Sequence, residues 1–308
     1  MGSVAVITDT NSGITLSEAE KAGIFLIPMP FTINGRSYTE GIDLTHEEFY
    51  KMLNDNADIH TSQPTAGQIM EVWDKALRVC EEAVYIPMSS GLSGSCQSAL
   101  VFAENYGGKV QVVDNHRISV TQRSSVYDAL SLSEGGMDAR SIKNLLEATK
   151  SDNSIYIMVD TLKYLQKGGR VTAAAAAFAQ ILNLKPILSI QGEKLDSFSK
   201  CRGTKQAKTI MINAIKNDIE KRFGGSDENR PSVWLSAVHS NDEKSAIEFR
   251  DEIEETFPGH SIYIDRLPLS ISCHIGPGSL AIACSKILDG GAKPDSSFMN
   301  TIVLPTSA

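Results

Sequence analysis

The stretch Ile86-Pro87-Met88-Ser89-Ser90-Gly91-Leu92-Ser93-Gly94-Ser95-Cys96-Gln97-Ser98-Ala99 is densely polar, yet it follows an apolar run that begins at Ala83. This order predicts a strand, then a loop, and then a helix that starts just after Ser93 or Ser95. Glycines let the loop turn sharply and approach a bound group closely, because they carry no Cβ atom. Hydroxyls and free backbone N–H groups at a helix start favour a bound anion. We interpret the stretch as a ligand loop.

Two familiar loop motifs do not fit this sequence. A P-loop needs a lysine after its glycines, and none follows here. A nucleophile elbow has the form G-x-S-x-G, whereas Gly91-Leu92-Ser93-Gly94 places the second glycine one residue too early. A Ser/Gly turn that merely caps a helix stays open as an alternative.

Strands alternate with helices on both sides of this loop. A continuous apolar run over Val4–Ile7 ends in the polar cluster Thr8–Gly13, and a strand over Val110–Val113 ends in Asp114-Asn115-His116. A further strand is expected over Ile24–Ile33. The alternation predicts an α/β fold with a three-layer, doubly wound parallel sheet, whose ligands lie beyond the C-terminal strand ends.

Capping boxes and turn signals mark the expected helices and one hairpin. Ser17–Glu20, Thr45–Glu48, Thr65–Gln68 and Ser240–Glu243 each have the spacing of a helix-capping box. Asn34-Gly35 between apolar runs predicts a hairpin turn.

The polar residues Ser151–Ser154 mark the candidate boundary of a second domain. After them, Lys185–Ile190 and Leu195–Lys200 predict an antiparallel hairpin, so the second sheet is expected to be mixed. We therefore predict an N-terminal α/β domain over 1–152, a C-terminal mixed-sheet α/β domain over 153–290, and a tail over 291–308 without assignment.

Three further expectations concern the second half. Alanine-rich residues Val171–Leu184 favour tight helix packing, with a narrow apolar ligand channel as the alternative. Ile262–Ile264 is the last clear strand. Cys273–Ser279 is expected to be a rigid Gly/Pro turn that presents His274, followed by a final helix that ends near Gly290.

Composition narrows the possible partners. The 308 residues carry a net charge of -8 and no basic block, which argues against nucleic acid and against an anionic membrane surface. The five cysteines form no C-x-x-C pair, which fits a reducing compartment and makes the cytoplasm the expected location. The most apolar N-terminal run is interrupted by Pro28 and Pro30, so we expect no signal peptide and no membrane insertion.

Four motifs in this order resemble the DegV family: Thr61-Ser62-Gln63-Pro64; Ser89–Gly94 with Gln97-Ser98-Ala99; Tyr164-Leu165 to Lys167-Gly168-Gly169-Arg170; and His274–Gly278. The resemblance covers about residues 4–288. It implies a two-domain α/β fold that holds a long-chain fatty acid in a tunnel between the domains. It also implies the acyl-binding subunit of a bacterial two-component fatty acid kinase, which presents the carboxylate to a separate ATP-binding kinase that makes acyl phosphate for phospholipid synthesis.

The same resemblance implies roles for individual residues. Thr61, Ser93 and His274 would bind the carboxylate, with Ser62 and the Gly94 backbone close by. Arg170 and Arg202 would lie near the headgroup and face the kinase. No catalytic residue, metal or cofactor is implied, so chemistry would need the partner.

Two alternatives compete with this interpretation. Ser93 and His274 could be the nucleophile and base of an esterase or thioesterase, although no orienting acid accompanies His274 in its motif. The protein could also be a lipid carrier or sensor without a kinase partner, which the sequence does not separate from a kinase subunit.

Overall fold

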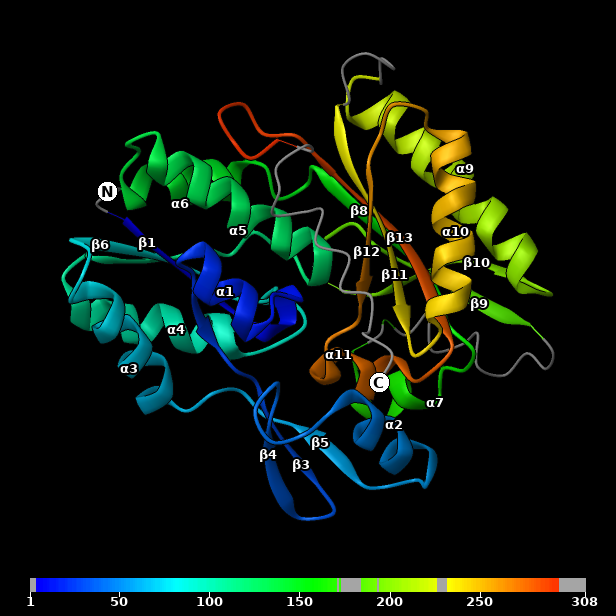
Figure 1. The fold of residues 1–308 in the computed structure, drawn as a ribbon, viewed down its shortest axis with the longest axis horizontal. Helices are drawn as coiled ribbons and strands as arrows, with labels where there is room; N and C mark the ends of the chain where they lie inside the picture. Colours follow the sequence, from blue (N-terminus) through cyan, green and yellow to red (C-terminus); the bar gives the residue numbers. More distant parts are fainter. Residues whose placement is uncertain (1–3, 171, 173–183, 193, 226–231, 294–308) are drawn as a thin grey trace.

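The computed structural model describes residues 4–170, 172, 184–192, 194–225 and 232–293 (Figure 1). Its first half builds a four-stranded sheet in the order β2-β1-β6-β7, in which every neighbouring pair is parallel. Burial of all of β1 agrees with a parallel strand covered on both faces. The strands are β1 (Val4–Asp9), β2 (Phe25–Ile27), β6 (Glu82–Ile86) and β7 (Val110–Val112).

Helices cover both faces of this sheet. On one face, Ile69 and Trp73 of α3 (Ala66–Leu77) and Cys96 of α4 (Ser95–Ala103) pack against Ile7 and Tyr85. On the other face lie α5 (Ser119–Glu134) and α6 (Ala139–Ala148), and α1 (Leu16–Ala22) links β1 to β2. The predicted three-layer doubly wound fold is confirmed. Two short 3-10 helices, η1 (Thr10–Ser12) and η2 (Glu104–Tyr106), follow β1 and α4.

The single strand expected over residues 24–33 is wrong, because the chain changes sheets within it. β2 ends at Ile27, and β3 (Pro30–Ile33) lies in a separate three-stranded antiparallel sheet, order β4-β3-β5. Pro28, just past the end of β2, has no N–H for a ladder hydrogen bond, which favours a break there. The Asn34-Gly35 turn between β3 and β4 (Arg36–Thr39) is confirmed, with positive φ at both residues. The third strand is β5 (Ile59–Thr61), and α2 (His46–Asn54) packs on this sheet.

Two of the four predicted capping boxes form as expected, at Thr45–Glu48 and Thr65–Gln68. The other two are misplaced. The first helix is capped by a box of Thr15 with Glu18 rather than by Ser17. Ser240 ends a strand and donates to the Gly276 carbonyl, while Asp242 caps the helix that follows. Several hydroxyl or carboxylate side chains precede each of these helices, so spacing alone does not select the capping residue.

The second half builds a six-stranded sheet in the order β10-β9-β8-β13-β11-β12. Only β11 and β12 pair in parallel, so the predicted mixed sheet is confirmed, as is the β9–β10 hairpin. The strands are β8 (Asn153–Met158), β9 (Lys185–Ile190), β10 (Asp196–Cys201), β11 (Val233–Ser240), β12 (Ile262–Arg266) and β13 (Ser279–Lys286).

The final helix expected after His274 is wrong. His274 lies in the last turn of a helix, α11 (Leu269–Ile275), and the residues after the Gly/Pro turn form β13. β13 pairs with both β8 and β11 in the interior of the sheet. Its residues alternate between two cores, with Ala281 and Ala283 in one and Leu280 and Ile282 in the other. Tertiary pairing therefore overrides the helical preference of its alanines.

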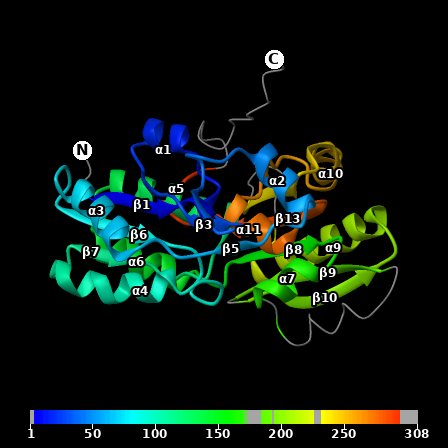
Figure 2. The same cartoon turned by 90° about the horizontal axis from the view of Figure 1, so that it is seen from below.

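The two halves of the molecule share one hydrophobic core. One face of the six-stranded sheet is covered by α9 (Thr204–Arg222) and α10 (Glu243–Thr256). The other face packs against α5, and a single cluster joins β1 and β6 to β8, β9 and β13 (Figures 1 and 2). The boundary at residue 152 stays a prediction; β8 begins at Asn153.

Two expectations fall on residues that the structure does not describe. Of the alanine-rich stretch 171–184, residues 171 and 173–183 lie outside the described part of the chain, as do residues 294–308 of the tail. Within the described ranges, no helix is long and apolar enough to cross a membrane.

Candidate functional site

A cavity of about 160 Å³ lies where the ligand loop, the small antiparallel sheet and α11 meet. It has a polar wall and an apolar wall, since hydroxyl, amide, imidazole and guanidinium side chains face isoleucine, leucine and methionine. The lining residues are Asn11, Met29, Thr61, Ser62, Gln63, Met88, Leu92, Ser93, Gly94, Ile118, Leu165, Arg170, Leu195, Ser270, Ile271, His274 and Ile275.

The Ser/Gly loop forms one side of this cavity. β6 leads in, and α4 begins at Ser95, as the sequence predicted. The Ser93 hydroxyl accepts from the Ser95 backbone N–H at 3.2 Å and lies 2.5 Å from the Ser95 hydroxyl. Asp114, at the end of β7, accepts from the Ser90 N–H at 3.3 Å. These bonds fix the loop at the C-terminal edge of the parallel sheet, where doubly wound folds bind ligands.

Thr61 and His274 come from opposite ends of the chain and meet in the cavity. Thr61 ends β5, and its hydroxyl lies 3.0 Å from Nε2 of His274. Burial, and then the nearby Arg170, lower the pKa of His274 to about 4. The imidazole is therefore neutral near pH 7 and carries one N–H.

Two glycines allow α11 to approach α7 (Lys163–Gly168) closely. A Cβ atom on Gly168 would lie 2.4 Å from Nδ1 of His274, and one on Gly276 would lie 2.4 Å from the Tyr164 ring. Gly276 also has a φ of 83°, which side-chain-bearing residues rarely adopt. The Gly-Gly-Arg and His-Ile-Gly-Pro-Gly motifs thus pack against each other.

Six of the seven site residues expected from the sequence line this cavity. Thr61, Ser62, Ser93, Gly94, His274 and Arg170 all do so. Arg202 does not; it is exposed between β10 and α9, and its backbone N–H donates to the Gln206 side chain.

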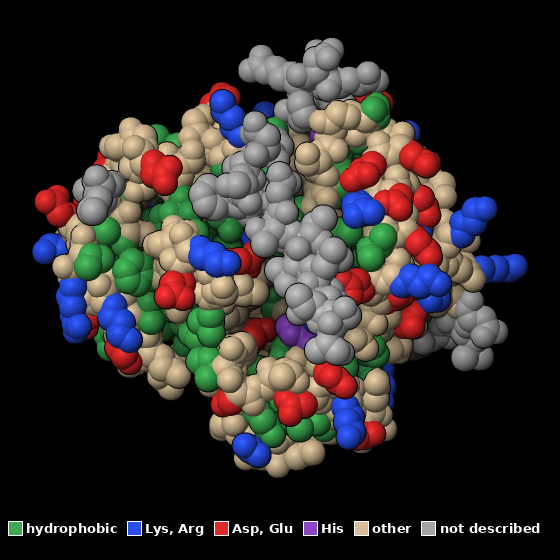
Figure 3. All heavy atoms as spheres, in the orientation of Figure 1, with side chains coloured by type: hydrophobic (Ala, Val, Ile, Leu, Met, Phe, Trp, Pro, Cys, Tyr) green, Lys and Arg blue, Asp and Glu red, His purple; other side chains and the backbone are tan. Residues whose placement is uncertain are grey.

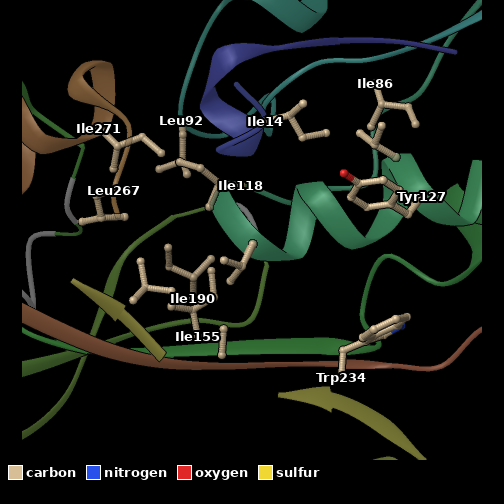
Figure 4. Packing of buried hydrophobic residues seen from close by; sticks show 14 of the residues in the cluster. Ile14, Ile86, Leu92, Ile118, Tyr127, Ile155, Ile190, Trp234, Leu267 and Ile271 are labelled. Atoms are coloured by element: carbon tan, nitrogen blue, oxygen red, sulfur yellow. The ribbon is translucent and has the colours of Figure 1, made fainter. Parts of the chain in front are cut away.

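The apolar wall continues into a second, smaller cavity of about 50 Å³. The two cavities share Ile118, Leu195, Ile271 and Ile275. Beyond these, the smaller cavity is lined by Ile155, Ile157 and Ile190 of the six-stranded sheet. Figure 4 shows Leu92, Ile118 and Ile271 gathered above Ile155 and Ile190, so the apolar path runs between the two halves.

Asn11 and Ser270 line the cavity but were not expected there from the sequence. The Ser270 hydroxyl contacts the Asn11 side-chain oxygen at 2.7 Å and the Glu40 carboxyl at 2.9 Å, and Thr10 donates to Glu40 at 2.7 Å. Burial raises the pKa of Glu40 to about 7. The sequence did contain a signal for Asn11, because this residue follows the end of a predicted strand, where ligands bind in doubly wound folds. Ser270 had no such signal, because it lies in α11, a helix that the sequence did not predict.

The geometry does not assemble a serine hydrolase triad. Among the described residues, no hydrogen bond joins Ser93 to His274, and no carboxylate bonds to His274. No group of three His, Cys, Asp or Glu side chains within the described ranges could hold a metal ion.

Comparison with known proteins agrees with this architecture. The sequence signature of the DegV family, described as "Uncharacterised protein, DegV family", matches residues 3–286. A DegV domain-containing protein of Caldanaerobacter subterraneus is 29% identical over 288 residues, or 92% of this chain and 98% of that protein.

Two solved structures are similar to the whole described fold. One shows fatty acid binding of a DegV family protein from Thermus thermophilus; it is 26% identical, the match covers 92% of this chain and 99% of that chain, and the TM-score is 0.84. The other is DegV, a fatty acid binding protein from Bacillus subtilis, with 26% identity, the same coverage and a TM-score of 0.80.

Proposed function

This chain belongs to the DegV family, and on that premise we propose that it binds one long-chain fatty acid, with the carboxylate at Thr61, Ser93 and His274. Ser62 and the Gly94 backbone complete the polar end. The acyl tail runs along Ile118 and Ile271 into the space between the halves. The observation that carries the proposal is the position of these three polar side chains at one end of a cavity whose continuation is apolar.

The acyl chain and the carboxylate of the ligand contribute differently to the binding free energy. Burying about 14 methylenes is worth on the order of 11 kcal/mol, at roughly 0.8 kcal/mol each, before association costs. Hydrogen bonds to a carboxylate add roughly 1.5–3 kcal/mol apiece. The tail therefore supplies most of the affinity, and the polar residues determine where the carboxylate points.

We further propose that the carboxylate is presented to a separate ATP-dependent kinase, which forms acyl phosphate. Arg170, beside His274 at the cavity, and the exposed Arg202 are the residues proposed to face that partner. This role places the protein in the cytoplasm, where ATP and phospholipid synthesis are found, and leaves the protein itself without catalytic activity.

Solvent extraction of the purified protein, followed by mass spectrometry, tests the binding proposal. We expect one fatty acid per chain, and recovery of binding when delipidated protein is given palmitate or oleate. The Thr61→Ala/Ser93→Ala double variant should retain less acyl chain, whereas Ser141→Ala, on α6 outside the cavity, should retain as much as the parent. Absence of fatty acid together with no binding of either acid would overturn the proposal.

The presentation step needs a separate test with a fatty acid kinase subunit and ATP. Acyl phosphate should form only when both are present with the loaded protein. His274→Ala should reduce turnover more than it reduces acyl retention, because the tail carries the affinity; equal losses would contradict this division. Normal fatty acid binding without acyl phosphate formation would contradict the kinase role and favour a lipid carrier or sensor.

A further inference from the structure

A second, larger cleft lies on the other side of α11 from the acyl cavity. It has a volume of about 670 Å³ and continues into a neighbouring groove of about 560 Å³. Both are lined by His46, His239, Glu243 and Arg266. Figure 2 shows α1, α2 and α10, which border the cleft, on one side of the molecule, and α4 and α7, which lie next to the acyl cavity, on the opposite side.

A buried polar wall separates this cleft from the acyl cavity. Thr10, Glu40 and Leu269 line the cleft, while Asn11 and Ser270 line the acyl cavity. The hydrogen bonds that join Thr10, Glu40, Ser270 and Asn11 close the space between them. Occupancy of the cleft is therefore a question separate from the proposed fatty acid binding.

Arg266 and His239 stand side by side at the centre of the cleft. They are register partners on the parallel strands β11 and β12, at the C-terminal edge of that pair. Open α/β sheets bind ligands at this edge. The Arg266 guanidinium has no hydrogen-bond or ion-pair partner among the described residues, and its backbone N–H is bonded to Asp265.

His239 is 3% exposed and has one unused donor. Its Nδ1 accepts from the Asp242 backbone N–H at 3.1 Å, so the proton of the neutral ring lies on Nε2. No described group accepts from Nε2. Because His239 lines the cleft, this N–H is available to a ligand there.

Arg266 places a positive charge beside both histidines of the cleft. Burial, and then this charge, lower the pKa values of His46 and His239 to about 4, and Asp242 offsets part of the effect at His239. Of the nearby acids, Asp242 caps α10 and Glu18 pairs with Arg123, while Glu243 and the buried Asp265 also line the cleft. The N-terminus of α10 adds a partial positive charge at the same edge.

We propose that this cleft binds the phosphate group of a small phosphorylated molecule, held by Arg266 and His239. A planar guanidinium and the Nε2–H of His239 offer several donors to the oxygens of a phosphate. The cleft beyond them has room for an organic body, with apolar contacts from Ile14, Leu44 and Ile247. A free organic phosphate and a lipid headgroup share this chemistry.

Calorimetric titration of the full chain with inorganic phosphate and with phenyl phosphate tests the proposal. We expect saturable binding of both, tighter for phenyl phosphate, and a loss of tenfold or more in Arg266→Gln. Arg250→Gln is the matched control, because Arg250 lines the same cleft but is paired with Asp251 at 2.7 Å. It should bind phosphate within about twofold of the parent.

A second variant and a spectroscopic measurement distinguish a lost phosphate contact from misfolding of Arg266→Gln. His239→Asn keeps an acceptor for the Asp242 N–H but removes the Nε2 donor, and it should also weaken binding. In the parent protein, phosphate should shift the imidazole NMR signals of His46 and His239 while leaving those of His60 and His116 in place. Fatty acid content should be unchanged in all variants.

Flotation with phosphatidylcholine vesicles that contain phosphatidic acid separates the two sources. Arg266-dependent flotation would assign a lipid headgroup, and binding of phenyl phosphate without flotation would assign a free phosphate. No saturable binding of any probe, or binding that Arg266→Gln leaves intact, would overturn the proposal.

Discussion

At the scale of the residue, the position of His274 depends on the absence of a side chain at Gly168, which lies against its ring. The sequence singled out the histidine and the Gly168-Gly169-Arg170 motif separately, but gave no sign that they touch. In the structure, Gly168 lies against the imidazole, and Thr61 contacts its other nitrogen. The ring is held between two elements that are more than 100 residues apart from it in the chain.

We therefore expect Gly168→Ala to displace His274 and weaken its contact with Thr61. Overpacking of this kind costs about 1–3 kcal/mol, measurable by urea unfolding, and the imidazole NMR signals of His274 should shift. Gly67→Ala is the control, because Gly67 also lies in a helix but its added Cβ would meet nothing within 4 Å. An unchanged His274 signal in Gly168→Ala would contradict the close contact.

The buried Glu40 leads to a prediction about pH. Its pKa is about 7 in the folded protein and about 4.5 when unfolded, so the folded state binds more protons between these values. Its contribution to stability is therefore lost as the pH rises from about 4.5 to 7. The histidines His46, His239 and His274, with pKa values lowered to about 4, act with the opposite sign in the same range.

Because these terms oppose each other, the difference between variants is the useful measurement. The stability of the parent relative to Glu40→Gln should fall by about 1–3 kcal/mol between pH 5 and pH 8. Urea unfolding at several pH values measures this difference. Glu71→Gln, at an exposed pair with Lys75, should show no comparable change. A difference between parent and Glu40→Gln that is constant with pH would contradict the raised pKa.

At the scale of the element, the sequence predicted the helices and strands that carry a local signal. It missed those whose conformation depends on tertiary contacts. The capped helices, the Asn34-Gly35 hairpin and the Ser/Gly loop rest on local signals. α5 was not predicted, because its buried positions carry polar residues: Gln122 bonds to Thr8, Asp9 and the Ile86 carbonyl, and Arg123 pairs with Glu18 at 2.7 Å. A helix buried through polar contacts has no hydrophobic stripe to detect.

β13 was mistaken for a helix for a related reason, since alanine suits helices in isolation. Ala283 is 2% exposed in the core shared with α5, so a larger side chain has no room there. Ala283→Leu should destabilise the protein by about 1–3 kcal/mol. Ile282→Val, on the opposite face of the same strand, should cost about 0.5–1.5 kcal/mol.

Chemical unfolding of both variants measures these costs. An unchanged free energy of unfolding in Ala283→Leu would show that the packing between β13 and α5 is looser than the structure indicates. The pair distinguishes the two faces of the strand, because Ile282 packs with α9 and α10 rather than with α5.

At the scale of the whole molecule, the fold class could be predicted, and six of the seven expected site residues line one cavity, because the fold brings their motifs together. The core shared by the two halves could not be predicted, since it depends on contacts between distant segments. Acidic and basic side chains are interspersed over the face seen in Figure 3.

The shared core leads to a last prediction, about unfolding of the delipidated and loaded protein. The proposed acyl tail touches residues of both halves, such as Ile118 and Ile190, so the ligand should stabilise the molecule as one unit. Calorimetry should give a single transition in both states. A fatty acid at 100 times its Kd adds about 2.7 kcal/mol, and Tm should rise by about 4 °C. Separate transitions, with only one raised by the ligand, would mean that the halves unfold independently and that the acyl chain lies within one of them rather than between them.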